Sequence, residues 1–136
     1  MALARVVLDT DILSAILRRN PHVLPKAQAY LAEHGQFTLS ILTRYEILRG
    51  LKSKGATRQV VAFDRFCLRT TILPFNEETA VKAAEIYAEL SNRGELIGDA
   101  DILIAASSLV NGLGVVTNNE SHFRRIPNLL VENWLK

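Results

Sequence analysis

Acidic side chains occur at three separate places in this sequence where metal chemistry can be built. Asp9 and Asp11 follow an apolar run, Glu46 lies in a mixed segment near the next such run, and Asp99 and Asp101 precede a long apolar stretch. Carboxylates held close together repel, so keeping them ionised requires a cation, and hard oxygen ligands select Mg²⁺ or Mn²⁺. A bound cation activates water and offsets charge building on phosphorus, and no serine–histidine or cysteine–histidine pair is placed for covalent chemistry. The pattern therefore predicts hydrolysis of a phosphodiester.

Each acid also has a purely structural interpretation. Asp9 follows its strand at a point where aspartate favours a turn or a helix cap. Thr43-x-x-Glu46 fits a capping box, in which the glutamate bonds only the backbone of the cap residue. Of the two acids before the apolar helix, we assign Asp99 to capping and Asp101 to the site.

A fourth segment adds oxygen-bearing side chains to the same predicted location. The strand-like run 115–117 ends in Thr117 and is followed by Asn118 and Asn119. Asparagine also tolerates left-handed turns, so a structural turn competes here. Parallel strands deliver their carboxyl ends to one edge of a sheet, which is where open α/β sheets bind ligands. Agreement among several strand ends favours a site, because capping would not require it.

The elements that must position these residues alternate along the chain. Runs rich in apolar and β-branched residues at 4–8, 37–40, 71–73, 115–117 and 129–131 predict strands. Helical periodicity fills the segments between them, so we expect an α/β fold: a three-layer α/β/α sandwich with a parallel sheet of four or five strands. With 136 residues, the chain 1–136 is expected to form a single domain.

Two helices are predicted from clear signals. One spans about 77–93, with Asn76 as N-cap and Gly94 just past its end. Its 3.6-residue period suggests a packing face made of Ala80, Val81, Ala84, Tyr87 and Ala88. The other, about 100–110, is apolar nearly all round, as expected for a central helix.

Composition narrows the location and the class of protein. Hydrophobic residues make up 49% of the chain and charged residues 22%, which is typical of a folded globular protein. The apolar start is short and interrupted by Arg5, and no stretch is long enough to span a bilayer, so we expect a cytoplasmic protein without a membrane partner. The lone Cys67 lies among aromatic residues and is expected to be buried filler.

Positive charge is concentrated in one segment. Between residues 44 and 69 there are seven basic residues against two acidic ones. Such a segment can receive a phosphate backbone, although on charge alone a solvated helical face is the favoured interpretation.

Four segments in order resemble the PIN-domain family, and within it the VapC toxins. They are Leu8-Asp9-Thr10-Asp11, the stretch from Ser40 through Thr43-x-x-Glu46 to Gly50, Gly98-x-x-Asp101-Ile102-Leu103, and Thr117-Asn118-Asn119 with the following His122-Phe123. Each segment alone is a weak pattern, but the ordered set covers nearly the whole chain and is specific.

The resemblance implies roles that spacing does not. Asp9, Glu46 and Asp101 match the family's core metal-binding acids, with possible auxiliary roles for Asp11, Asp99, Thr117 and Asn119. Asn119 stands where many relatives have a fourth acid, which leaves a second metal site open. The family further implies an RNA substrate, a homodimer and a cognate antitoxin that occupies the active-site groove. Arg44, Arg49 and Lys52 then become candidate residues of the RNA or antitoxin groove.

Two other classes of protein share parts of the pattern. A haloacid-dehalogenase-type phosphatase also begins with a strand and Asp-x-Asp, and would use Asp9 as a nucleophile. Leu13 and the short Asp99–Asp101 spacing depart from that family. A non-enzymatic receiver-like module also gathers acids around Mg²⁺, but it requires a lysine near its last strand, where this chain has none.

Overall fold

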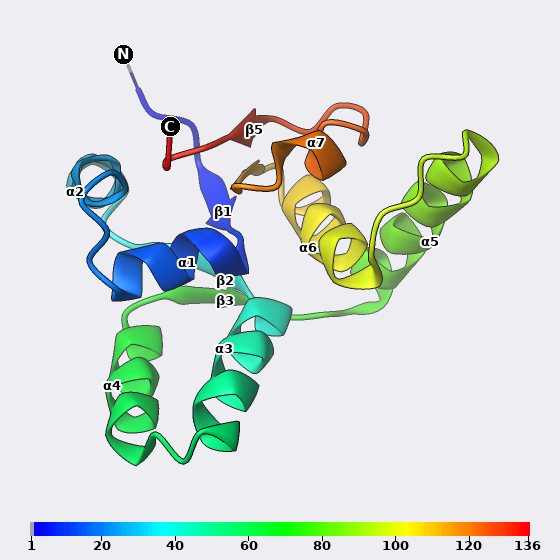
Figure 1. The fold of residues 1–136 in the computed structure, drawn as a ribbon. Coiled ribbons are helices and arrows are strands. Elements are labelled where there is room, and N and C mark those ends of the chain that lie inside the picture. Colours follow the sequence, from blue (N-terminus) through cyan, green and yellow to red (C-terminus); the bar gives the residue numbers. More distant parts are fainter. Residues whose placement is uncertain (1) are drawn as a thin grey trace.

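The computed structural model describes residues 2–136 as a set of short parallel strands flanked by helices (Figure 1). The strands are β1 (Val6–Leu8), β2 (Thr38–Ser40), β3 (Thr71–Leu73), β4 (Gly114–Val116) and β5 (Val131–Glu132). Hydrogen bonds join them in the orders β1-β4-β5 and β2-β3, all pairs being parallel. β1 lies against β2, which brings the two groups side by side. The predicted strands are confirmed in place, with the last one shifted toward the C-terminus.

Side chains of alternate strand residues point to two separate cores. Val6 and Leu8 of β1 pack into one core, whereas Val7 between them packs into the other. β4 does the same with Val116 and Val115. Because successive side chains of a strand face opposite sides of the sheet, both faces must be covered by helices. The predicted α/β/α arrangement is confirmed.

Helices from different parts of the chain cover the two faces. They are α1 (Thr10–Leu17), α2 (Leu24–His34), α3 (Ile41–Ser53), α4 (Thr57–Leu68), α5 (Glu77–Asn92), α6 (Asp99–Val110) and α7 (Glu120–Phe123). Residues of α1, α2 and α4 enter the core of Leu8, and residues of α5 and α6 enter the core of Val7. In Figure 1, α3 lies between α4 and α6, and it contacts both.

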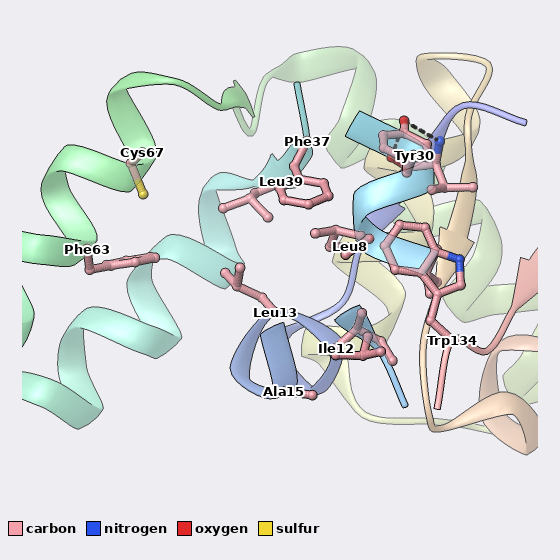
Figure 2. Packing of buried hydrophobic residues seen from close by; sticks show 14 residues of the cluster. Leu8, Ile12, Leu13, Ala15, Tyr30, Phe37, Leu39, Phe63, Cys67 and Trp134 are labelled. Atoms are coloured by element: carbon pink, nitrogen blue, oxygen red, sulfur yellow. Dashed lines mark hydrogen bonds between the residues drawn. The ribbon is translucent and has the colours of Figure 1, made fainter. Parts of the chain in front are cut away.

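The first core is rich in aromatic residues (Figure 2). The Tyr30 ring lies 5.5 Å from that of Trp134, and its hydroxyl accepts a hydrogen bond from the backbone N–H of Val6 at 3.2 Å. A buried phenol needs such a partner. Cys67 is buried here as predicted, so the packing of this core ties α2 and α4 to the start of β1.

The boundaries of α5 were predicted correctly, but its packing face was not. Asn76 caps the helix by accepting a hydrogen bond from Thr79 N–H at 3.0 Å, and Gly94 adopts a positive φ just beyond the end. The buried residues are Thr79, Ala83, Ile86 and Leu90. Val81 and Tyr87 of the predicted packing face are instead half exposed, at 50% and 49%. Both sides of α5 carry apolar residues, so periodicity alone selected the wrong one.

No helix within residues 2–136 is long and apolar enough to cross a membrane.

Candidate active site

Asp9 is the most deeply buried acid of the chain's described part. It directly follows β1 and is the N-cap of α1, where its Oδ1 accepts from Thr10 N–H at 2.8 Å. Its Oδ2 accepts from the hydroxyl of Thr117 at 2.7 Å, and only 6% of the residue is exposed. The cap interpretation of Asp9 is therefore correct, yet it uses only one of the two carboxylate oxygens. Thr117, at the end of the neighbouring strand β4, fixes the other.

The environment of Asp9 disfavours its charged form. Burial, and after it the negative charge of Asp11 with a smaller contribution from Asp101, raises its pKa to about 7. The hydrogen bonds from Thr117 and Thr10 act in the opposite direction. A nearby positive charge would favour the ionised form of a carboxyl group in such surroundings. Such perturbed groups cluster at functional sites.

Asp11 contributes a buried oxygen without a partner. Its Oδ2 accepts from the backbone N–H of Asn118 at 3.0 Å. Its Oδ1 is buried and makes no hydrogen bond with any described residue. Burial raises the pKa of Asp11 as well, and the charge of Asp101 adds to that rise. A buried carboxylate oxygen without a partner is costly, and a cation ligated by Asp11 would satisfy it.

Asp101 lies in the first turn of α6 and meets the segment after β4. Its Oδ2 accepts from the side-chain amide of Asn119 at 3.0 Å and lies 3.2 Å from Nδ1 of His122. Asn119 Nδ2 is also 2.8 Å from His122 Nδ1. No role was assigned to His122 from the sequence, and the structure brings it to Asp101. The signal that was available is the three-residue spacing of Asn119 and His122 across a helical turn.

Glu46 reaches the site through Thr10. Its Oε1 accepts from the Thr10 hydroxyl at 2.6 Å, and that hydroxyl lies 3.2 Å from the hydroxyl of Thr43. The capping-box alternative is wrong, because α3 begins at Ile41 and its N-cap is Ser40, which accepts from Leu42 N–H at 3.1 Å. Glu46 thus lies inside the helix, and its carboxylate does not take part in capping.

Asp99 does not cap α6, contrary to the sequence-based assignment. The N-cap is Gly98, which makes no side-chain cap bond, and Asp99 is the first helical residue with an exposed side chain. In the first turn both Asp99 and Asp101 complement the helix dipole without serving as the cap. Of the two, Asp101 contacts the segment after β4, through Asn119 and His122.

The side chains present fit a divalent cation that keeps part of its water shell. Across residues 2–136 no three Asp, Glu, His or Cys side chains gather tightly enough to form a complete metal-binding cluster. Asp9, Asp11 and Asp101 nevertheless perturb one another electrostatically, and all are hard oxygen donors. Mg²⁺ is commonly held by one or two carboxylates plus waters, so an incomplete protein shell is compatible with it. Asp9, Asp11 and Asp101 are the candidate ligands, and Glu46 contacts Thr10, the residue between Asp9 and Asp11.

The candidate groove residues of α3 differ in what they can offer. Arg44 is paired with Asp64 at 2.9 Å and lies over the Phe63 ring, so its charge is largely used within the α3–α4 pair. Arg49 lies over the exposed ring of Tyr45, 5.2 Å from its centroid, and 3.9 Å from Glu46. Lys52 is exposed one turn beyond it. Of the three, Arg49 and Lys52 present the freer charges, and Arg49 lies beside Glu46.

A parallel α/β/α domain with acids gathered at its strand ends is the arrangement that the resemblance to PIN domains implied, and the comparison with known families agrees. The family model described as "PIN domain" matches residues 6–129, and the chain belongs to this family. Because the match extends over most of the chain, it replaces the phosphatase and receiver alternatives.

Relatives place the chain more narrowly, among the VapC ribonucleases. It is 35% identical over 132 residues to "Ribonuclease VapC2" of Haemophilus influenzae, covering 96% of this chain and 98% of that protein. It is 28% identical over 131 residues to the "tRNA(fMet)-specific endonuclease VapC" of Salmonella typhimurium, with coverage of 96% and 98%. The structure of VapBC2 from Rickettsia felis, bound to a promoter DNA fragment, matches with a TM-score of 0.83 at 31% identity, over 95% of this chain and 98% of that one.

Proposed function

We propose that this chain, as one nuclease domain over residues 1–136, is a Mg²⁺- or Mn²⁺-dependent endoribonuclease that acts as the toxin of a toxin–antitoxin pair. The observation that carries the proposal is the buried acidic group at the strand ends. Asp9 and Asp11 at the end of β1 and Asp101 at the start of α6 repel one another, and the pKa of Asp9 is raised to about 7. An arrangement that is unfavourable without a cation is expected to have been built around one.

The residues of the chain divide the work of phosphodiester hydrolysis. A divalent cation, when bound, makes water a stronger nucleophile at neutral pH and offsets charge on the phosphoryl oxygens. Asp9 and Asp101 would hold it, and Asp11 and Glu46 would add negative charge around it. Thr117 holds Asp9 through its hydroxyl at 2.7 Å, and Asn119 holds Asp101 through its amide at 3.0 Å. Thr117 and Asn119 are therefore positioning residues, and Arg49 is placed to receive a phosphate.

The proposed partners are an antitoxin and a second copy of the chain. The similar Rickettsia felis structure is a VapBC2 complex, which supports a cognate antitoxin that covers the acidic groove. Homodimer formation is supported by the half-exposed Val81 and Tyr87 on α5, because apolar residues on one helix face favour association. The Salmonella relative is a tRNA(fMet)-specific endonuclease, which makes a transfer RNA the first substrate to test.

The proposal is tested by incubating the purified protein with total transfer RNA, without metal and with Mg²⁺ or Mn²⁺. We expect new RNA fragments only when metal is present, and loss of cleavage in excess EDTA that is reversed by adding Mn²⁺ back. Cleavage that continues undiminished in EDTA would contradict the proposal, since the acidic site then has no role for a cation.

A further inference from the structure

The basic segment between residues 44 and 69 divides into two surfaces in the folded chain. Arg44 and Arg49 are on α3, next to the acidic site or paired across the α3–α4 contact. Arg58 and Arg65 lie on the next helix, α4, and Arg69 is its C-cap. Because α3 lies between α4 and α6, the second surface is separated from the acids by a whole helix (Figure 1).

The three arginines of α4 share one face of the helix. Their spacing of seven and then four residues places them in a single row, with Ala62 between the first two. Phe63 and Cys67, on the other side of α4, are buried in the first core (Figure 2). The row, which we call the arginine stripe (Arg58, Arg65 and Arg69), therefore faces solvent, and all three residues are exposed.

None of the three guanidinium groups is neutralised within residues 2–136. The arginines found there in ion pairs are Arg44, Arg49, Arg93 and Arg124, and the stripe makes neither an ion pair nor a side-chain hydrogen bond. Arg44, by contrast, is paired with Asp64 at 2.9 Å, whereas the stripe arginines keep their charge available to a partner. Three unpaired charges in a row are instead an electrostatic surface for a polyanion.

A hollow beside the stripe supplies apolar contact. It has a volume of about 450 Å³ and is formed where α4 meets the end of α2, with Arg65 and Arg69 at its edge and Leu31, Phe37 and Phe66 among its lining residues. The rings of Phe37 and Phe66 stack at 6.1 Å. Proteins that bind RNA single strands combine a positive surface for the phosphates with aromatic side chains for the bases. The hollow and the stripe together have this composition.

We propose that the arginine stripe and the adjoining hollow form a second RNA-docking surface, remote from the acidic site, that holds the body of a structured RNA while another part of it is cut. The inference rests on the proposed ribonuclease function for its substrate. The unpaired positive charges favour a polyanion over a neutral protein surface, and the half-buried Phe66 offers a stacking surface beside them. A short oligonucleotide would fill the acidic site without reaching α4.

The test replaces Arg65→Gln and Arg69→Gln together. Glutamine keeps the helix propensity of arginine, so α4 is expected to remain intact. The matched control, Arg5→Gln with Lys82→Gln, removes the same two charges from residues away from α4. Binding of total transfer RNA is measured in EDTA at several salt concentrations, and cleavage of a hexanucleotide is measured with Mn²⁺.

We expect the stripe variant to bind transfer RNA roughly tenfold more weakly than the control, because it loses contacts with phosphates. Each lost contact should also make the dependence of log K on log salt less steep, by about 0.7–0.9. Its cleavage of the hexanucleotide should equal that of the control. Ala62→Glu, which places a negative charge inside the stripe, should weaken transfer RNA binding in the same way.

Unchanged affinity and unchanged salt slope in the stripe variant would overturn the inference. So would equally tight binding of polyglutamate that is lost in the same variant, because the surface would then fit an acidic protein segment rather than RNA. Binding in EDTA does not depend on cleavage, so failure of the ribonuclease proposal would appear separately, as absence of metal-dependent fragments from either RNA.

Discussion

At the scale of single residues, the raised pKa of Asp9 has a measurable effect on the stability of the folded chain. Its pKa of about 7 lies well above the ordinary value of 3.8. At any pH between these two values, Asp9 is mostly protonated in the folded chain and mostly ionised in the unfolded chain. Over that interval the native state binds more protons, and stability must fall as pH rises. The loss is complete once pH exceeds the folded pKa.

We expect the metal-free protein to be less stable at pH 7.5 than at pH 5, with Asp9 contributing on the order of 3 kcal/mol to the difference. In Asp9→Asn this contribution disappears, so its stability should depend less on pH over the same interval. Urea unfolding at both pH values measures the effect. An identical pH dependence in the two proteins would show that Asp9 titrates normally.

Glu46 offers a second residue-scale prediction, now that the capping box is excluded. Glu46→Gln keeps a carbonyl oxygen that can accept from the Thr10 hydroxyl, so stability without metal should be nearly unchanged. Loss of one negative charge should weaken metal binding. Both the rise in melting temperature produced by Mn²⁺ and the rate of RNA cleavage should therefore be measurably smaller than in wild type. If the shift and the rate both equal those of wild type, Glu46 serves only to bind Thr10.

The site residues that could be identified from the sequence are those that lie at the end of a predicted strand or at the start of a predicted helix. Asp9 and Thr117 end strands, and Asp101 begins an apolar helix, so the strand-end rule sufficed to bring them together. His122 could not be found in that way, because its contact with Asp101 depends on how the turn after β4 folds back onto α6. Thr10 was missed for the same reason, since its hydrogen bond to Glu46 crosses between two helices.

At the scale of elements, the contact between β4 and the chain before β5 depends on the absence of a side chain. A Cβ atom at Gly114 would lie 3.0 Å from the backbone oxygen of Leu130. Gly50, inside α3, has nothing within 4 Å of the equivalent position. The same substitution is therefore expected to act in opposite directions at the two sites.

Gly114→Ala should lower the free energy of unfolding by about 1–3 kcal/mol, because the backbone of the neighbouring segment must move. Gly50→Ala should raise it by about 0.5–1 kcal/mol, since alanine favours the helix and loses less backbone entropy on folding. Denaturant unfolding compares both with wild type. A stabilising effect at Gly114 would mean that β5 is not held as closely to β4 as described.

Element boundaries were largely predictable, whereas the packing of α5 was not. Asn76 and Gly94 mark the ends of that helix, because residue type alone determines a preference for the N-cap or for the left-handed position after a helix. The choice between its two apolar faces depends on which one the sheet occupies. Ala83 and Ile86 face the second core, and Val81 and Tyr87 were selected in error because both sets satisfy the helical period.

At the scale of the whole molecule, the exposed face of α5 leads to a test of the proposed homodimer. Tyr87→Lys places a charge at a half-exposed apolar position and should shift the protein from dimer to monomer in sedimentation equilibrium. Glu89→Lys, on the other exposed side of α5 beside Arg93, should leave the dimer intact. A protein that is monomeric before any substitution, or a dimer unaffected by Tyr87→Lys, would remove α5 from the proposed interface.

The central claim concerns which acids act in RNA cleavage, and α6 provides a matched pair to decide it. Asp101 contacts Asn119 and His122 at the acidic site, whereas Asp99, two residues earlier in the same helical turn, is exposed. Replacing either by asparagine removes one charge and little volume. The decisive measurement is the Mn²⁺-dependent cleavage rate of transfer RNA by the two variants. We predict that Asp101→Asn lowers it by about two orders of magnitude or more while Asp99→Asn stays within about twofold of wild type. Wild-type cleavage by Asp101→Asn would contradict the account.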